Sequence, residues 1–295
     1  MVRLPRIAIT VGDPAGIGPE IAAAAASHPR VTEVCEPVIY APPSIAGIEI
    51  GKVSAAAGQA AYDTIVRAVD AARAGEVAAV ATAPISKLAL SHAGLPWKGH
   101  TELFAHLCGV KRVAMMFHAP QLKVVLITVH VPISEVPALL TQSLTEEIMT
   151  LTAEELPRFG VPNPRIALAG LNPHAGENGV LGFEDLNVLV PAVAAVRARG
   201  INATGPYPAD TVFVRAHRGE FDCVVACYHD QGLVPVKLLA FGQSVNVTLG
   251  LPIIRTSVDH GTAFDIAGRG VADPSSMIEA VLLAARLATT PETRS

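Results

Sequence analysis

The chain has 295 residues and a formal net charge of −4, and it is 51% hydrophobic but only 4% aromatic. A chain of this length forms one large domain or two of ordinary size, with a core built mainly from Ala, Val, Leu and Ile. The mild negative charge and the lack of a Lys/Arg run argue against a surface for nucleic acid or another polyanion. We therefore expect no nucleic-acid partner.

The four cysteines are too few and too scattered for a disulfide framework. Cys223 and Cys227 flank an apolar strand pattern, which favours buried thiols over metal ligands. The chain enters a strand directly, without the apolar stretch of a signal peptide, and no window reaches about 18 uninterrupted apolar residues. These features predict a reduced, cytoplasmic protein with no membrane partner.

In chain order, short apolar strands alternate with amphipathic or Ala-rich helical stretches, which is the pattern of an α/β fold. A strand at residues 6–11 is followed by a Gly/Pro turn and a helix at 19–27. Further strands are predicted at residues 77–82, 113–117, 122–129, 165–170 and 223–228. Further helices are predicted at residues 58–74, 101–107, 145–159, 186–199 and 275–288.

Three histidines each follow an apolar, β-branched stretch. They are His130, His174 in Asn-Pro-His-Ala-Gly-Glu (172–177), and His229 in Tyr-His-Asp-Gln-Gly (228–232). Neutral imidazole is a common metal ligand, and strand ends are where a rigid scaffold presents chemistry. Three such ligands with coordination positions left open are typical of a catalytic metal site. The alternative is three hydrogen-bonded histidines that share no site.

Residues 12–20 read Gly-Asp-Pro-Ala-Gly-Ile-Gly-Pro-Glu and link the first strand to the first helix. The glycines permit tight turns, and Pro19 suits the first helical position. The spacing is neither that of the dinucleotide fingerprint nor that of a P-loop. Taken alone, the pattern predicts a glycine-rich turn at a helix N-terminus, where an anion is tolerated.

This turn resembles the opening loop of the metal-dependent β-decarboxylating dehydrogenases that act on isocitrate and isopropylmalate. Residues 260–270 (His-Gly-Thr-Ala-Phe-Asp-Ile-Ala-Gly-Arg-Gly) resemble their nucleotide-binding loop. Five further motifs resemble the 4-hydroxythreonine-4-phosphate dehydrogenase family of pyridoxal-phosphate biosynthesis, and they lie at residues 99–102, 172–177, 208–211, 228–233 and 246–252. The match continues through residues 254–262 and runs in order from about residue 6 to about residue 280.

The resemblance implies a two-domain isocitrate/isopropylmalate dehydrogenase-like α/β fold. It consists of α/β/α sandwich layers with a mixed sheet and an active site in the interdomain cleft. Residues 1–95 and 262–295 would form the nucleotide-side domain, and residues 96–261 the metal, substrate and dimerisation domain. One departure is that the segment around residues 41–50 looks shorter than in typical members, which bears on the local sheet edge and on the exact substrate.

The resemblance also implies that His130, His174 and His229 hold one divalent metal, with Zn, Mg, Co, Mn and Ni as candidates. In the family, the residue matching His229 comes from the neighbouring subunit. The expected assembly is therefore a homodimer with a shared active site.

By the same resemblance, His100, Thr101, Lys237, Asn246 and Arg255 contact the substrate. His and Thr suit a phosphate or carboxylate oxygen, and Arg offers a bidentate fork for an anion. The Lys would also transfer a proton near the reacting carbon. A structural ion pair is the alternative role for the Arg, which ends a buried strand.

Asp210 and Asp230 are predicted to act with the catalytic Lys237 by orienting the histidine ligands. Asp230 has the alternative role of capping a loop. NAD or NADP would rest near Gly261 and Thr262, and also near Asp265 and Gly268, with backbone amides supplying much of the recognition.

The resemblance therefore implies oxidation and decarboxylation of 4-phosphooxy-L-threonine, a small phosphorylated hydroxy acid. One alternative is a related dehydrogenase that acts on threonate or erythronate 4-phosphate or on a cyclic cis-diol carboxylate. Another is a non-catalytic protein that binds a metal or an anion. A metallohydrolase would also use three histidines, but the chain has no His-Glu-x-x-His sequence and that function would leave residues 260–270 unexplained.

Overall fold

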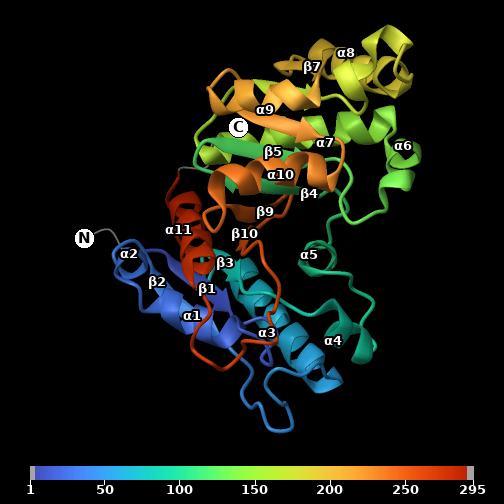
Figure 1. Cartoon of the computed structure of the whole chain (residues 1–295). Helices are drawn as coiled ribbons and strands as arrows, with labels where there is room; N and C mark the ends of the chain where they lie inside the picture. Colours follow the sequence, from blue (N-terminus) through green and yellow to red (C-terminus); the bar gives the residue numbers. More distant parts are fainter. Residues whose placement is uncertain (1–3, 291–295) are drawn as a thin grey trace. The chain divides into compact units, whose positions relative to one another are not determined.

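The computed structural model describes residues 4–290, which divide into two compact units (Figure 1). The first unit joins residues 4–113 to residues 245–290, and the second comprises residues 114–244. The unit boundaries therefore lie at 113/114 and 244/245 rather than at the expected 95/96 and 261/262. The reason is that the strands over residues 245–257 extend the sheet of the first unit.

The first unit is built on a mixed sheet with strand order β2-β1-β3-β10-β9. Strands β2, β1, β3 and β10 are parallel, and β9 is antiparallel to β10. β2 is in continuous register with β1, so the short segment that follows it leaves this edge of the sheet intact. The bounds are β1 (Arg6–Thr10), β2 (Glu36–Tyr40), β3 (Ala79–Thr82), β9 (Val245–Leu249) and β10 (Ile254–Ser257).

Helices cover both faces of this sheet, as alternate residues of β1 show. Ile7 and Ile9 pack into a cluster with α1 and α11, whereas Ala8 packs on the opposite side with α3 and α5. This is the three-layer α/β/α arrangement expected when strand side chains alternate between two buried faces. The bounds are α1 (Gly18–Ala26), α2 (Pro29–Thr32), α3 (Ala55–Arg73), α4 (Lys87–His92), α5 (His100–Cys108) and α11 (Ser275–Thr289).

In the second unit the strand order is β4-β5-β8-β6-β7. β4 and β5 form an antiparallel hairpin, and β5, β8, β6 and β7 run parallel to their neighbours. The bounds are β4 (Ala114–Ala119), β5 (Leu122–Leu126), β6 (Ile166–Ala169), β7 (Ala203–Tyr207) and β8 (Cys223–Ala226).

Helices α9 and α10 pack on one face of these strands through a cluster that includes Phe213 and Val236 (Figure 1). α7 and α8 contact each other, and α8 also contacts β7. The longer helices are α7 (Gln142–Glu155), α8 (Val190–Ala198), α9 (Ala209–His217) and α10 (His229–Ala240). The short helical segments are η1 (Ile133–Glu135), α6 (Val136–Leu139), η2 (Leu156–Phe159), η3 (Pro173–Gly179) and η4 (Asp185–Leu189).

Gly232 allows α10 to lie close to the sheet. A Cβ at this position would lie 2.6 Å from Cδ2 of Leu126 and 2.8 Å from Cγ1 of Val124. We expect Gly232→Ala to lower the free energy of unfolding by about 1–3 kcal/mol, because the added methyl overpacks this contact. Urea denaturation would measure the loss. Val214→Ala at an exposed position of α9 is the control, with an expected change within about 0.5 kcal/mol.

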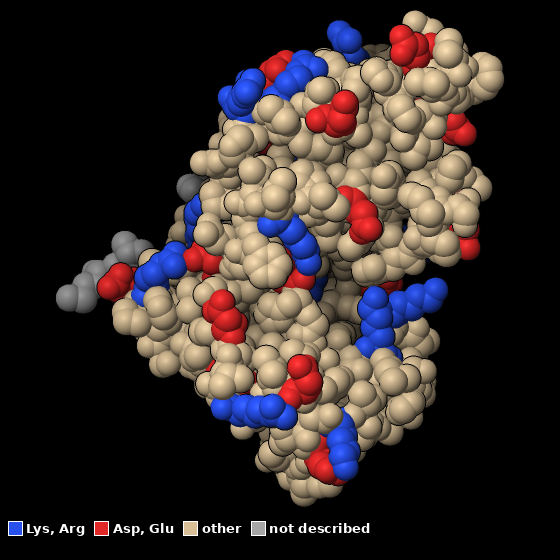
Figure 2. Space-filling view, viewed as in Figure 1, with Lys and Arg blue, Asp and Glu red and all other residues tan. Residues whose placement is uncertain are grey.

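Within residues 4–290, every helix is too short or too polar to span a lipid bilayer. On the face that Figure 2 shows, Lys and Arg side chains are interspersed with Asp and Glu over a largely uncharged surface.

Candidate active site

The three histidines follow the carboxyl ends of three neighbouring parallel strands of the second unit. His130 lies beyond β5, His229 is the first residue of α10 after β8, and His174 lies in η3 after β6. Because β8 pairs in parallel with both β5 and β6, these strand ends meet at one edge of the sheet. In open α/β sheets, ligands bind at this edge.

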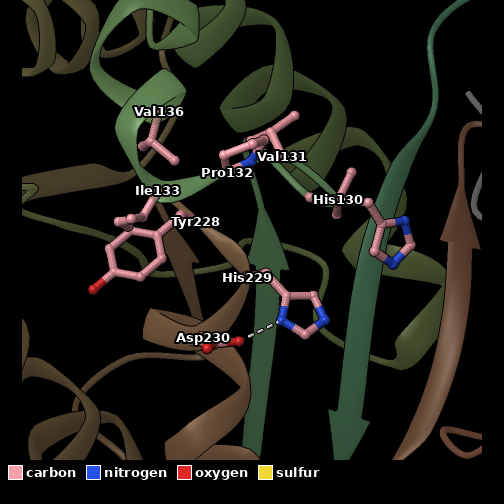
Figure 3. Close-up of a pocket in the computed structure, with 9 residues that line it drawn as sticks. His130, Val131, Pro132, Ile133, Val136, Tyr228, His229 and Asp230 are labelled. Carbon is pink, nitrogen blue, oxygen red and sulfur yellow. Dashed lines mark hydrogen bonds and ion pairs between the residues drawn. The ribbon is translucent and has the colours of Figure 1, made fainter.

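His130 and His229 line one pocket of about 590 Å³. Their ring centroids are 5.8 Å apart and the ring planes are inclined by 42° (Figure 3). Nδ1 of His229 lies 2.7 Å from Oδ1 of Asp230, which leaves Nε2 of the same ring for another partner. A carboxylate that holds the far nitrogen is the usual support of a metal-binding histidine. Asp230 thus contacts the ring that it is predicted to orient.

The rest of the pocket wall is mostly apolar. In Figure 3, Ile133, Val136 and the Tyr228 ring gather on the side of the pocket away from the His130 ring. Val136 is buried, whereas Ile133 is exposed. The histidine pair is thus flanked by an apolar surface, which limits the number of alternative polar partners near the two rings.

His174 does not line this pocket. Its side chain is 69% exposed, and its Nδ1 lies 4.0 Å from Oε2 of Glu177. Over the part of the chain that the structure describes, no three His, Cys, Asp or Glu side chains are grouped so that they could hold a metal. The structure thus brings together two of the three predicted ligands of one chain.

The other predicted residues of the second unit are separated from the pair. Asp210 is exposed in the first turn of α9, and no hydrogen bond or ion pair joins it to a histidine among residues 4–290. Lys237 lies on α10 eight residues after His229, about 12 Å along the helix. The seven-residue spacing places it on the same face of α10 as Asp230.

A second group of predicted residues lies in the first unit, around Arg255 of β10. This side chain is only 1% exposed, and its guanidinium lies 5.4 Å from the centre of the Phe104 ring. It donates hydrogen bonds to the hydroxyls of Thr248 (3.0 Å) and Thr82 (2.8 Å), and its buried Nε has no partner. Burial lowers the pKa of Arg255 to about 9, against the attraction of Glu102. Its hydrogen-bond partners are neutral hydroxyls rather than carboxylates.

Two neighbouring polar atoms are also buried without a hydrogen-bond partner. They are Nε2 of His100, in the first turn of α5, and Oδ1 of Asn246, on β9. Thr101 is half-buried beside the histidine. Unsatisfied buried polar atoms are costly and call for a specific explanation. A polar ligand that fits among them would satisfy the imidazole, the amide and the guanidinium together.

His100 should make the stability of the protein depend on pH. Burial, and secondarily repulsion from Arg255, holds the pKa of His100 well below its ordinary value of 6.5. The unfolded chain therefore binds a proton below about pH 6.5 that the folded protein does not, and stability falls as the pH drops through this range. Denaturation from about pH 8 to about pH 5 should show wild type losing stability relative to His100→Gln below about pH 6.5. The exposed His217→Gln variant is the control. If the stability difference between wild type and His100→Gln stayed constant across this pH range, as it should for His217→Gln, the low pKa of His100 would be contradicted.

The two loops that resemble parts of the β-decarboxylating dehydrogenases contact each other in the first unit. The amide of Ile17 donates to the carbonyl of Thr262 (3.0 Å), and the amide of Gly270 donates to Oε2 of Glu20 (3.2 Å). A Cβ at Gly16 would lie 2.8 Å from the same carbonyl, so this contact requires glycine.

The predicted nucleotide residues are placed differently within this pair of loops. Gly261 and Asp265 are exposed, and Gly268 has a φ of +74°. Oε1 of Glu20 and Nε2 of His260 are buried without partners. Open glycine backbone beside unsatisfied polar atoms fits a polar cofactor such as NAD.

Sequence reasoning missed residues that support the site. The side chain of Gln231 donates to the carbonyl of Gly170 (2.7 Å) and accepts from the amide of Cys227 (2.7 Å), so it ties the end of β6 to the end of β8. Thr82 and Thr248 hold the Arg255 guanidinium. Gln231 lies within the motif at residues 228–232, but Gly170 is 61 residues away from it, and Thr82 is 173 residues from Arg255, so no local pattern indicates these contacts.

Comparison with known proteins matches residues 13–284 to a family described as "Pyridoxal phosphate biosynthetic protein PdxA". A relative from Desulforapulum autotrophicum, named 4-hydroxythreonine-4-phosphate dehydrogenase, is 45% identical over 97% of this chain and 96% of its own length. A relative from Cupriavidus necator, named D-threonate 4-phosphate dehydrogenase, is 43% identical over 97% of this chain and 98% of its own length.

The crystal structure of 4-hydroxythreonine-4-phosphate dehydrogenase from Klebsiella pneumoniae superposes with a TM-score of 0.88 at 41% identity, covering 98% of this chain and 99% of that one. A β-decarboxylating dehydrogenase from Thermococcus kodakarensis shares the fold. It superposes with a TM-score of 0.50 at 16% identity and covers 93% of this chain and 81% of that one. The predicted fold class and the predicted resemblance are both confirmed. The chain belongs to the PdxA family of pyridoxal-phosphate biosynthetic proteins.

Proposed function

We propose that this protein is a metal-dependent, NAD- or NADP-linked dehydrogenase that converts 4-phosphooxy-L-threonine to 3-amino-2-oxopropyl phosphate in pyridoxal-phosphate biosynthesis. The observation that carries the proposal is the buried cationic cluster around Arg255, with its unsatisfied guanidinium, imidazole and amide atoms. Relatives of 44–45% identity that bear the name 4-hydroxythreonine-4-phosphate dehydrogenase support it. The four free cysteines and the need for a nicotinamide cofactor accord with the predicted cytoplasmic location.

The Arg255 cluster suits one anionic end of the substrate. A guanidinium held by two hydroxyls still offers its buried Nε to an oxygen, and a buried cation gains strongly from an anion that enters the same low-dielectric space. Neutral His100 adds an uncharged ring nitrogen, and Asn246 adds an amide. We assign this cluster, with Thr101, to the phosphate or the carboxylate.

The His130 and His229 pair suits the first two ligands of a divalent metal. Two imidazole rings that line one pocket are a fitting donor set, and Asp230 fixes the orientation of one ring. A bound divalent cation there would lower the pKa of the substrate hydroxyl, polarise the resulting ketone and stabilise the negative charge that develops on decarboxylation. Zn, Co and Ni suit the imidazoles, while Mg and Mn would rely more on substrate oxygens.

The reaction balances with the cofactor and the protein alone. The hydroxyl-bearing carbon gives a hydride to NAD and its oxygen gives up a proton, which yields a 3-oxo acid and NADH. The 3-oxo acid then loses carbon dioxide, and the carbon that carried it gains a proton. We assign this proton to Lys237, which lies on the helix that begins with His229. The nicotinamide cofactor would rest on Gly261, Thr262, Asp265 and Gly268.

A second candidate substrate is D-threonate 4-phosphate, because a relative of 43% identity carries that specificity in its name. The two substrates differ in the group beside the carboxylate, an amine in one and a hydroxyl in the other. Steady-state kcat/KM with 4-phosphooxy-L-threonine, threonate 4-phosphate, erythronate 4-phosphate and a cis-dihydrodiol carboxylate, each with NAD and NADP, separates them. The highest kcat/KM with the first substrate supports the proposal. No turnover with any of them, despite tight metal binding, would favour a non-catalytic binding protein.

We further propose that the protein works as a homodimer. Helix α10 exposes Val234 (64%), Leu238 (83%) and Phe241 (81%), the last at its C-terminal end. A second apolar group lies between η3 and η4 and includes Val180 (77%) and Phe183 (61%). Apolar side chains concentrated in this way favour burial against a second copy of the chain.

A dimer would also complete the metal site. The family resemblance has the neighbouring subunit contribute the residue that matches His229. In this chain His229 already lies beside His130, which favours His174 of a second copy as the third ligand. We therefore propose a shared site in which His130 and His229 come from one subunit and His174 from the other.

Mixed dimers test this arrangement. Equal mixing of His174→Ala with His229→Ala chains should regain about a quarter of wild-type activity, because half of the dimers are hybrids and each hybrid has one intact site. Mixing His130→Ala with His229→Ala should regain none, because every site then lacks a ligand. Activity of unfolded and refolded mixtures measures both. Recovery in the second mixture, or no recovery in the first, would refute the arrangement.

A further inference from the structure

We propose that Asp185 is a positioning residue that holds His174 in a left-handed turn and so presents its imidazole as a ligand. The inference rests on the proposed metal-dependent function. The carboxylate itself touches no reacting group. Its role is to fix the backbone of residues 170–176.

The turn that carries His174 adopts a backbone conformation that L-residues rarely take. From His174 to Asn178 the φ angles are +55°, +53°, +78°, +45° and +55°, and only Gly176 among these residues is a glycine. In this conformation Cβ crowds the following carbonyl oxygen, so each non-glycine residue is disfavoured. Such a turn persists only when its surroundings fix it, and fixed strain of this kind clusters at functional sites.

Asp185 supplies the fixing contacts. Its Oδ1 accepts a hydrogen bond from the amide of Leu171 (2.8 Å), and its Oδ2 accepts from the amide (3.0 Å) and from the side-chain Nδ2 (3.0 Å) of Asn172. The side chain is 1% exposed, and its bonded partners are N–H donors rather than a cation. Charge-assisted hydrogen bonds in a buried place are strong, so the carboxylate anchors the backbone directly before Pro173 and His174.

The packing around the carboxylate leaves little freedom. A Cβ at Gly170 would lie 2.8 Å from Oδ1 of Asp185, and a Cβ at Gly176 would lie 3.3 Å from its Cβ. Asp185 therefore fills the space between the end of β6 and the turn itself. Gln231 bonds the carbonyl of Gly170 and the amide of Cys227, so the same backbone is tied to the strand end that precedes His229.

Asparagine at position 185 would keep the shape and lose the function. Its amide nitrogen would face N–H donors where the carboxylate oxygen accepts, so at least one of the three hydrogen bonds is replaced by a clash of donors. The turn then relaxes, and His174 leaves its ligand position more often. Outer residues that orient a metal ligand change metal affinity by about 10–100-fold when they are replaced.

The experiment is a Co²⁺ titration of the full-length protein, followed by the visible absorption of the bound ion. We expect the dissociation constant for Co²⁺ to rise by about 10–100-fold in Asp185→Asn and at least as much in His174→Ala. Asp222→Asn is the matched control, because Asp222 accepts the amide of Arg165 (2.8 Å) at the other end of the same strand. It should leave the dissociation constant within about twofold.

The outcomes separate this inference from the function on which it rests. An unchanged dissociation constant in His174→Ala would overturn His174 as a ligand. A raised constant in His174→Ala with an unchanged one in Asp185→Asn would overturn only the role of Asp185.

A second pair of variants covers the case in which Asp185→Asn does not fold. Ala175 has a φ of +53°. Ala175→Gly should keep the Co²⁺ affinity because glycine adopts this conformation freely, whereas Ala175→Val should weaken it because a β-branched residue resists it. Equal affinities in the two variants would show that the left-handed turn does not position the ligand.

Discussion

Replacing His229 with alanine is expected to lower kcat by at least about 10²–10³-fold with 4-phosphooxy-L-threonine. The histidine is one of two imidazoles that face a common pocket, and Asp230 holds its ring. Its loss would leave His130 without its neighbour and would remove the charge stabilisation that the decarboxylation needs. Stopped-flow or steady-state NADH absorbance measures the fall.

The matched control for this variant is His217→Ala. His217 is exposed at the end of α9 in the same unit, and its replacement should leave kcat within about twofold. The affinity for Co²⁺ should fall in the His229 variant alone. A His229→Ala enzyme that retains more than about a tenth of wild-type kcat would show that this histidine is not a metal ligand.

Replacing Arg255 with methionine should separate activity from stability. The buried guanidinium has neutral hydrogen-bond partners and an unsatisfied Nε, so the folded protein without substrate carries a buried charge that is only partly offset by Glu102. A methionine of similar length removes that cost, and we expect a melting temperature equal to or above that of wild type. Loss of a buried anion contact costs about 2–5 kcal/mol, so kcat/KM should fall by about 30- to 4,000-fold.

Two further variants test whether the effect depends on the guanidinium of Arg255 in particular. Arg255→Lys keeps the charge but loses the planar fork, so it should stay well below wild type in kcat/KM. Arg30→Met breaks a surface ion pair with Glu279 and should change neither quantity appreciably. A marked fall in the melting temperature of Arg255→Met, with little change in KM, would instead assign Arg255 a structural role.

Many of the strands could be predicted from the sequence because they are short runs of apolar residues. The strands that contain Val124, Leu168 and Val224 are recognisable for this reason, and their carboxyl ends place the histidines at one sheet edge. The motifs at residues 12–20 and 260–270 were also informative, since the structure brings these two loops into contact.

The helix that begins with His229 was harder to predict. Its sequence contains Gly232 and Pro235, which normally interrupt helices. Here tertiary packing decides, because the glycine lets the helix lie against Leu126 and Val124 of β5. The left-handed turn at His174 gave no local sign either, since four of its five residues are not glycine.

The other contacts that could not be predicted join residues that lie far apart in the sequence. Asp185 lies 13 residues from Asn172, and Thr82 lies 173 residues from Arg255. Nothing in the local sequence around either residue indicates its partner. The burial of Arg255 was equally hidden, because an arginine at the end of an apolar run is compatible with solvent, an ion pair or an anion site.

The most direct test of the proposed activity is the joint yield of NADH and carbon dioxide from 4-phosphooxy-L-threonine. We would measure it before chelation, after chelation and after re-addition of a divalent metal. Our account predicts equal yields of the two products, loss of both with the chelator and recovery of both with the metal. Turnover that persists after complete removal of metal, or NADH formed without carbon dioxide, would contradict it.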